Sequence, residues 1–234
     1  MNATKLLVPL ALILLAPAPV RVGPPTICVP LDIGDARSIP LPGDKGAKPL
    51  ALGDLAGETL AVLAAGQDPE VHFETLRRAA LTLMGPGRES REASASAAAA
   101  GAAIAEGLRR ALIECEARPG SKPTERALAW FDLGLWLLDL RVVGHEDEGS
   151  WELYLDRADR MAGEDAGLQV CLFAANFGER AGERWRPNLR RLSYLVKDPD
   201  TRTARNLLRL TKHFLSVDGL DALRERFAEA EGKK

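Results

Sequence analysis

The chain has 234 residues, of which 46% are hydrophobic and 27% are charged, and its formal net charge is −2. This balance is typical of a folded globular protein with one domain or two small ones. It excludes a generally polybasic protein, so nucleic acid is not an expected partner.

The first 22 residues predict an export signal. They hold one lysine, Lys5, followed by an apolar run from Leu6 to Val20. The run is shorter than the ~20 apolar residues that cross a bilayer, but it suits the hydrophobic part of a signal peptide. Residues 16–18 are the small residues of a cleavage site, although Pro19 disfavours cleavage there, so an uncleaved anchor stays open. We expect the protein to be periplasmic or secreted.

Residues 23–53 predict an extended strap that leads into the rest of the chain. They are rich in Pro and Gly and hold no helical period. Large apolar side chains nevertheless recur in the strap: Ile27, Val29, Leu31, Ile33, Ile39 and Leu41. Because apolar surface costs ~25 cal/mol per Å² to leave in water, we expect the strap to dock on the remainder. Cys28 does not fit a lipid attachment site, since bulky Ile27 precedes it.

Residues 54–234 predict an all-α domain, a bundle of about seven to nine helices. Asp68 followed by Pro69 is typical of a helix start, and the Gly-Pro-Gly at 85–87 of a helix end. The segment 124–144 is apolar nearly all round apart from Asp132 and Asp139, which predicts a helix at the centre of the bundle. No alternating β-branched run of strand length is present.

The cysteines other than Cys28 are Cys115 and Cys171. Each shares a helical face with two leucines, which favours two buried thiols. A Cys115–Cys171 disulfide stays open for an exported chain, because geometry rather than spacing decides whether it forms.

The sequence shows no motif for a metal, a cofactor or a catalytic nucleophile. His72, His145 and His213 lack the i, i+4 spacing that would place two metal ligands on one helical face. Phosphate-binding loops and nucleophile elbows are also missing from the pattern. We therefore expect no metal and no cofactor. An enzyme whose site is assembled from dispersed histidines and carboxylates remains the alternative to a protein without catalytic activity.

A basic stretch covers residues 180–212, with Trp185 and Tyr194 among its arginines and lysines. Four of its cations recur at threes and fours on one predicted helix and should project together: Arg202, Arg205, Arg209 and Lys212. We favour their neutralisation by the acidic helix around Asp156 and Asp159. The alternative is a patch that binds an anionic partner.

Two stretches, ICVPLDIGDARSIP at 27–40 and VHFETLRRAAL at 71–81, resemble uncharacterised exported helical proteins of bacteria. The resemblance implies an exported helical protein and brings no activity and no site residues. Together these patterns favour a non-enzymatic helical binding or scaffold protein of the cell envelope. Its partner stays open between another protein and an anionic envelope component.

Overall fold

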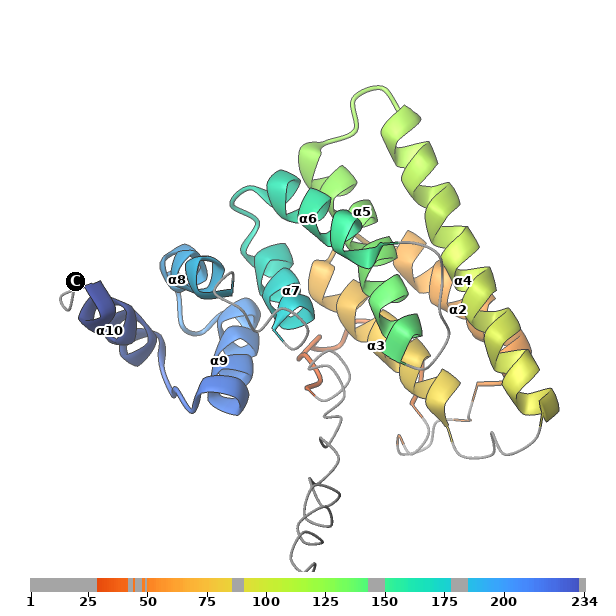
Figure 1. The fold of residues 1–234 in the computed structure, drawn as a ribbon, viewed down its shortest axis with the longest axis horizontal. Helices are drawn as coiled ribbons and strands as arrows, with labels where there is room; N and C mark the ends of the chain where they lie inside the picture. The colour runs from red at the N-terminus through yellow and green to blue at the C-terminus, as the bar shows by residue number, and fades with distance from the viewer. Residues whose placement is uncertain are drawn as a thin grey trace, which may run out of the picture.

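The computed structural model describes residues 29–41, 44, 48, 50–85, 91–142, 150–177 and 185–231. Nine α-helices and no strand occupy these residues (Figure 1), so the prediction of an all-α multi-helix bundle is confirmed. The helices are α2 (Leu52–Ala64), α3 (Pro69–Met84), α4 (Arg91–Ala117), α5 (Pro123–Val142), α6 (Trp151–Ala162), α7 (Ala166–Asn176), α8 (Trp185–Leu195), α9 (Arg202–Leu215) and α10 (Leu220–Glu231).

Several helices begin where a side chain accepts hydrogen bonds from the free N–H groups of the first turn. The Asp68 carboxylate accepts from the N–H groups of Glu70 and Val71, and Pro69 stands at the first position of α3, as predicted. Asp165 caps α7 and Thr201 caps α9 in the same way. The boundaries of these helices therefore follow from local chemistry.

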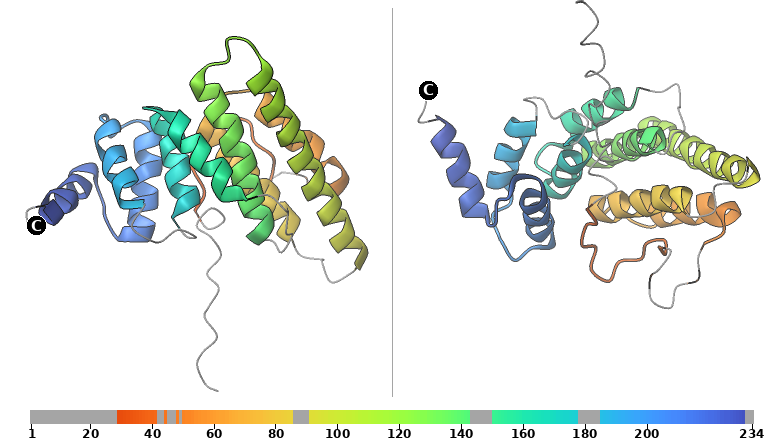
Figure 2. Two further views of the ribbon diagram at one scale, coloured as in Figure 1. Left: turned by 45° about the horizontal axis from the view of Figure 1, so that its top comes forward. Right: turned by 60° about the horizontal axis from the view of Figure 1, so that its bottom comes forward.

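Helix α5 forms the centre of the bundle and contacts α3, α4, α6 and α7. Its residues are buried on every side over most of its length, which agrees with its nearly continuous apolar sequence. Figure 2 shows α2 and α3 side by side in one layer, with α4 and α5 in the next. The buried indole of Trp136 donates a hydrogen bond of 3.0 Å to the Gly101 carbonyl and links α5 to α4.

The C-terminal helices extend the molecule away from this bundle. Helices α8 and α9 pack on α7, and α10 packs on α8 (Figure 1). Arg224 of α10 donates to the carbonyls of Ser193 and Val196. These two residues lie at the C-terminal end of α8. Within the described part of the chain, no helix combines the length and apolar character needed to cross a membrane.

Residues 29–41, the longest described part of the strap, run along the outer side of the layer formed by α2 and α3 (Figure 2). Val29, Leu31, Ile33 and Ile39 are buried there, and Leu41 is half-buried. Ile27, Cys28 and the predicted export signal at 1–22 lie outside the described residues.

Candidate functional site

A cleft with a volume of about 500 Å³ opens between α2, α4 and α5. Its walls combine aliphatic with charged side chains, and the imidazole of His72 is the one aromatic ring among the described residues that line it. The apolar walls include Leu60 and Leu63 from α2, Leu108 and Ala111 from α4, and Leu128 and Ala129 from α5. This size and composition are those of a pocket for a small molecule.

Gly107 lets α2 approach α4 closely at one wall of the cleft. A Cβ atom at this position would lie 2.3 Å from the Cδ1 atom of Leu60, far inside van der Waals contact. The missing side chain thus brings the Leu60 methyl groups against the backbone of α4. A small residue at this crossing sets the width of the cleft.

His72 and Asp132 form a buried pair that lines the cleft. Nδ1 of His72 lies 2.8 Å from Oδ2 of Asp132, and Nε2 lies 3.1 Å from the Gly66 carbonyl oxygen. Each ring nitrogen thus faces an oxygen atom of the protein, an arrangement that favours the doubly protonated ring of an imidazolium. Burial lowers the pKa of His72, but the charge and hydrogen bond of Asp132 outweigh it, and the net pKa is raised.

This arrangement commits both nitrogens of His72 to the protein itself. A general base needs one ring nitrogen free of a proton and within reach of the substrate. Neither nitrogen is available to a substrate here, because each lies at hydrogen-bond distance from an oxygen of the protein. The pair therefore links α3 to α5 and has a structural role.

The second carboxylate oxygen of Asp132 differs from the first. Oδ1 is buried and has no hydrogen-bond partner among the described residues. A buried carboxylate oxygen without a partner is unfavourable by about 1–3 kcal/mol, so a water molecule or a donor group would be stabilised next to it. Asp132, which carries this buried acceptor, is also one of the residues that line the cleft.

Charged residues of both signs line the rest of the cleft. Arg110, Glu114 and Arg118 follow one another at intervals of four residues near the end of α4, and Glu125 stands at the start of α5. Two cations and two anions leave no net charge. A ligand that fits this lining has an aliphatic part and polar groups rather than a large charge of one sign.

The two cysteines within the described residues are free thiols. Cys115 is buried at the cleft, and Cys171 is fully buried in α7. Burial first, and then the nearby charges of Glu70 and Asp68, raise the pKa of Cys171 well above its usual value. The Cys115–Cys171 disulfide that the sequence left open is not present in the structure, where both thiols are free.

The four cations on α9 each have a partner within the protein. Arg202 pairs with Asp68 and with Glu70, whose Oε2 lies 2.6 Å from Nε of the arginine. Arg205 pairs with Asp32, and Lys212 with Asp218. Arg209 donates to the Pro30 carbonyl at 3.0 Å.

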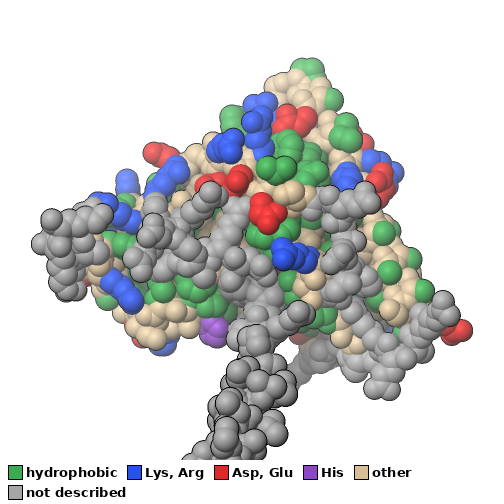
Figure 3. All heavy atoms as spheres, in the orientation of Figure 1, with side chains coloured by type: hydrophobic (Ala, Val, Ile, Leu, Met, Phe, Trp, Pro, Cys, Tyr) green, Lys and Arg blue, Asp and Glu red, His purple; other side chains and the backbone are tan. Residues whose placement is uncertain are grey.

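These partners are not the ones expected from the sequence. The acidic residue Asp159 accepts instead from Gln169. Three of the four cations on α9 reach the strap or the first turn of α3, 132 to 179 residues away along the chain. On the face seen in Figure 3, acidic and basic side chains are interspersed, with apolar side chains between them.

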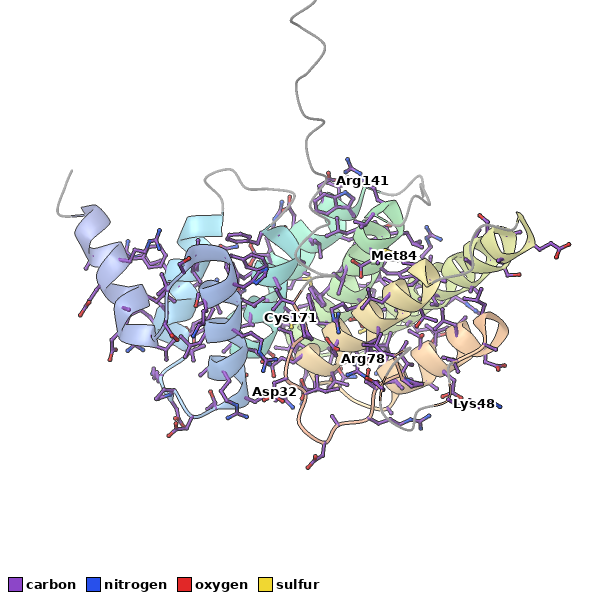
Figure 4. All side chains as sticks on the ribbon, turned by 90° about the horizontal axis from the view of Figure 1, so that it is seen from below. Asp32, Lys48, Arg78, Met84, Arg141 and Cys171 are labelled. Atoms are coloured by element: carbon purple, nitrogen blue, oxygen red, sulfur yellow. The ribbon has the colours of Figure 1, made fainter. Side chains whose placement is uncertain are left out.

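Asp32 is the acidic residue of the strap that meets α9. Figure 4 shows it from below, where α9 and α3 face each other. The Gly34 N–H donates to its Oδ1 at 2.9 Å and, although burial opposes this, lowers the pKa of the carboxyl together with Arg205. Arg78 of α3 also meets the strap and donates to the Ile39 carbonyl at 3.1 Å.

Sequence reasoning missed the His72–Asp132 pair. Its members lie 60 residues apart, and His72 carries no motif. The available signal was Asp132 itself, since a carboxylate in a helix that is apolar on all sides needs a partner. His145 lies outside the described residues, and no cluster of potential metal ligands occurs within them.

Comparison with protein-family models, with curated proteins and with solved structures finds no match to this chain.

Proposed function

We propose that this chain is an exported, non-catalytic binding protein that takes a small amphipathic ligand in the cleft between α2, α4 and α5. The observation that carries the proposal is the cleft itself, about 500 Å³ in volume and lined by both aliphatic and charged side chains. Pockets of this size, mostly apolar with a few convergent polar groups, are the usual form of a small-molecule site.

The polar groups of the cleft support binding rather than a reaction. His72 is bonded at both nitrogens, while Asp132 offers one unsatisfied acceptor. The charges of Arg110, Glu114, Arg118 and Glu125 suit a polar head group. These features hold and orient a ligand without a free base to attack it.

The proposal is tested with the dye 1-anilinonaphthalene-8-sulfonate, whose apolar rings suit the walls and whose sulfonate suits the two arginines. The variant Ala111→Trp places an indole in the cleft from an exposed position of α4. We expect it to remove most of the dye fluorescence of the wild-type protein.

Ala102→Trp is the matched control. Ala102 is also exposed on α4 but lies nine residues earlier, about two and a half turns, so it faces the opposite side of the helix. It should leave dye binding unchanged. Equal dye binding by Ala111→Trp and the wild type would show that the cleft is not the binding site.

Export is tested separately by cell fractionation and N-terminal sequencing. The proposal rests on the lysine and the apolar run within residues 1–22. We expect the protein outside the cytoplasm. An intact Met1 on a soluble cytoplasmic protein would contradict export and leave the cleft proposal untouched.

A further inference from the structure

The first residues of the described strap have the side-chain pattern of a β-strand, although no strand lies beside them among the described residues. Val29, Leu31 and Ile33 are buried, while Pro30 is exposed and Asp32 is half-buried. An extended chain places alternate side chains on opposite sides, so three apolar residues point into the protein. The segment 29–33 is thus bound as an extended peptide.

Side chains of α3 and α9 provide the hydrogen bonds that a neighbouring strand would otherwise give. Asn206 accepts from the Asp32 N–H at 2.6 Å and donates to the Asp32 carbonyl at 2.9 Å. Glu74 accepts from the Leu31 N–H at 3.3 Å. Arg209 and Arg202 donate to the carbonyls of Pro30 and Ile33. Four consecutive residues of the strap are held through their main-chain atoms.

The receiving side chains are fixed by the body of the protein. Glu74 is fully buried and accepts 2.6 to 2.8 Å hydrogen bonds from Arg77 and Arg78, its neighbours on α3. Arg202 is held by Asp68 and Glu70. Such pre-ordered groups are what a recognition site needs, because little freedom is lost when the peptide arrives.

Asn206 binds the strap through both polar atoms of its side chain. With the strap in place the side chain has no exposed surface, and its amide oxygen and nitrogen both bond the main chain of Asp32. Removal of the strap would take away both partners of this amide and expose the apolar surface that Val29, Leu31 and Ile33 cover. One amide that bonds both the N–H and the carbonyl of a single residue recognises the main chain of a peptide. A neighbouring β-strand makes the same pair of hydrogen bonds.

We propose that the groove between α3 and α9 is a recognition site for an extended peptide with apolar residues on both sides of an acidic one, and that it takes the strap of a second copy of this chain. Arg205 supplies the charge that pairs with the acidic residue, while Arg202 and Arg209 donate to main-chain carbonyls on either side of it. In the single chain the groove is filled by its own strap. Exchange of an identical segment between two copies forms the same contacts in a dimer at little cost in contact energy.

The first test nicks the full chain. A protease site replaces residues 45–47, between the strap and α2, and the cut protein is mixed with a fluorescent peptide of residues 29–41. We expect the cut strap to co-elute with the body in gel filtration and then to exchange for the peptide, with a rise in fluorescence anisotropy. The uncut chain, whose groove is filled, should take up at least tenfold less peptide.

Variants of the peptide and the groove make this test specific. A peptide with Leu31→Asp and Ile33→Asp should bind at least tenfold more weakly, and Asn206→Ala in the nicked protein should weaken binding about tenfold. Lys212→Ala is the matched control on α9. Its side chain is about two-thirds exposed and pairs with Asp218 rather than with the strap, so its loss should leave binding unchanged. Equal binding of both peptides would overturn the recognition site.

The second test addresses the second copy and also covers a nicked protein that fails to fold. Full-length Leu31→Asp/Ile33→Asp carries a defective strap and an intact groove. Full-length Asn206→Ala carries an intact strap and a defective groove. We expect a 1:1 heterodimer when the two folded variants are mixed, and monomers of each alone, in analytical ultracentrifugation. Monomers only in the mixture, with both variants helical by circular dichroism, would overturn strap exchange.

Discussion

Asp132 lies in the central helix α5, most of whose residues are buried, and there a carboxylate is costly unless it has a partner. His72 supplies that partner from the first turn of α3. Both side chains are less than a tenth exposed, so their attraction is only weakly screened by solvent. Loss of either partner would leave a buried charge or a buried donor unpaired.

The pair makes the stability of the protein depend on pH. The pKa of His72 is raised above its ordinary value of 6.5 in the folded state. Its contribution to the free energy of unfolding is therefore fully present below pH 6.5 and is lost as the pH rises through the higher folded pKa. We expect wild-type stability to fall over this interval.

The measurement is urea denaturation at pH 5.5 and at pH 9 for the wild type and for His72→Gln. Glutamine keeps one amide donor but does not titrate. The wild type should exceed the variant by about 1–3 kcal/mol at pH 5.5 and by clearly less at pH 9. A difference that stays constant between the two pH values would contradict a charged His72.

Single residues also show how far sequence reasoning reaches. Asp68 and Pro69 were predicted as a helix start because the capping contact spans only a few residues. The second role of Asp68, its ion pair with Arg202, joins residues 134 apart and leaves no local pattern. Such partners depend on the packing of whole helices, so the cationic face of α9 was predicted but its partners were not.

Among the elements, helix crossings depend on glycines within the helices. Gly134 of α5 lies against α6, where an added Cβ would come within 2.9 Å of the Tyr154 Cβ and the Leu155 Cδ2. Gly107 of α4 lies against the end of the Leu60 side chain, which borders the open cleft. An alanine at Gly134 would therefore meet the rigidly placed Cβ of Tyr154. An alanine at Gly107 would meet the end of the Leu60 side chain, which can move.

We expect Gly134→Ala to destabilise the protein by about 1–3 kcal/mol, because α6 must shift to relieve the contact. Gly107→Ala should be neutral or stabilising by up to about 1 kcal/mol, since Leu60 can rotate and alanine favours the helix. Thermal unfolding of both variants measures the difference. Equal losses at the two positions would mean that Leu60 is as rigid as the backbone of α6.

At the level of elements the sequence predicts most of the fold. The nine helices of the described residues agree with the expected seven to nine, and apolar residues all round α5 agree with its central place. The helical period of α9 predicts a core-facing side, on which Ala204, Leu207 and Thr211 are buried, whereas Leu208, Phe214 and Leu215 are half-buried. It gives no signal for buried Asn206, because the strap covers a part of the helix that the bundle leaves open.

In the whole molecule, the strap joins two groups of helices that otherwise meet chiefly through α7. Its residues contact α3 on one side and α9 on the other. Local opening of a protein follows the regions with the fewest buried contacts, and α10 packs on α8 at the far end. The strap should therefore control how readily the C-terminal helices open.

Leu31→Ala should raise amide hydrogen exchange in α9 and α10 while leaving α4 and α5 protected. Hydrogen exchange read by mass spectrometry measures this region by region. Leu153→Ala, at an exposed position of α6, is the control and should leave every region unchanged. A uniform rise over all helices in Leu31→Ala would show that the strap stabilises the whole molecule evenly.

The distance along the chain between Asp32 and Asn206, 174 residues, also sets an order of events during synthesis. At about 5–20 residues per second, a ribosome completes α9 roughly 10 to 30 s after the strap has left it. Until then Leu31 and Ile33 have no α9 to cover them and are open to chaperones. The strap is thus made before every described helix but is among the last segments to dock. It can bind its site between α3 and α9 only after α9 has been made.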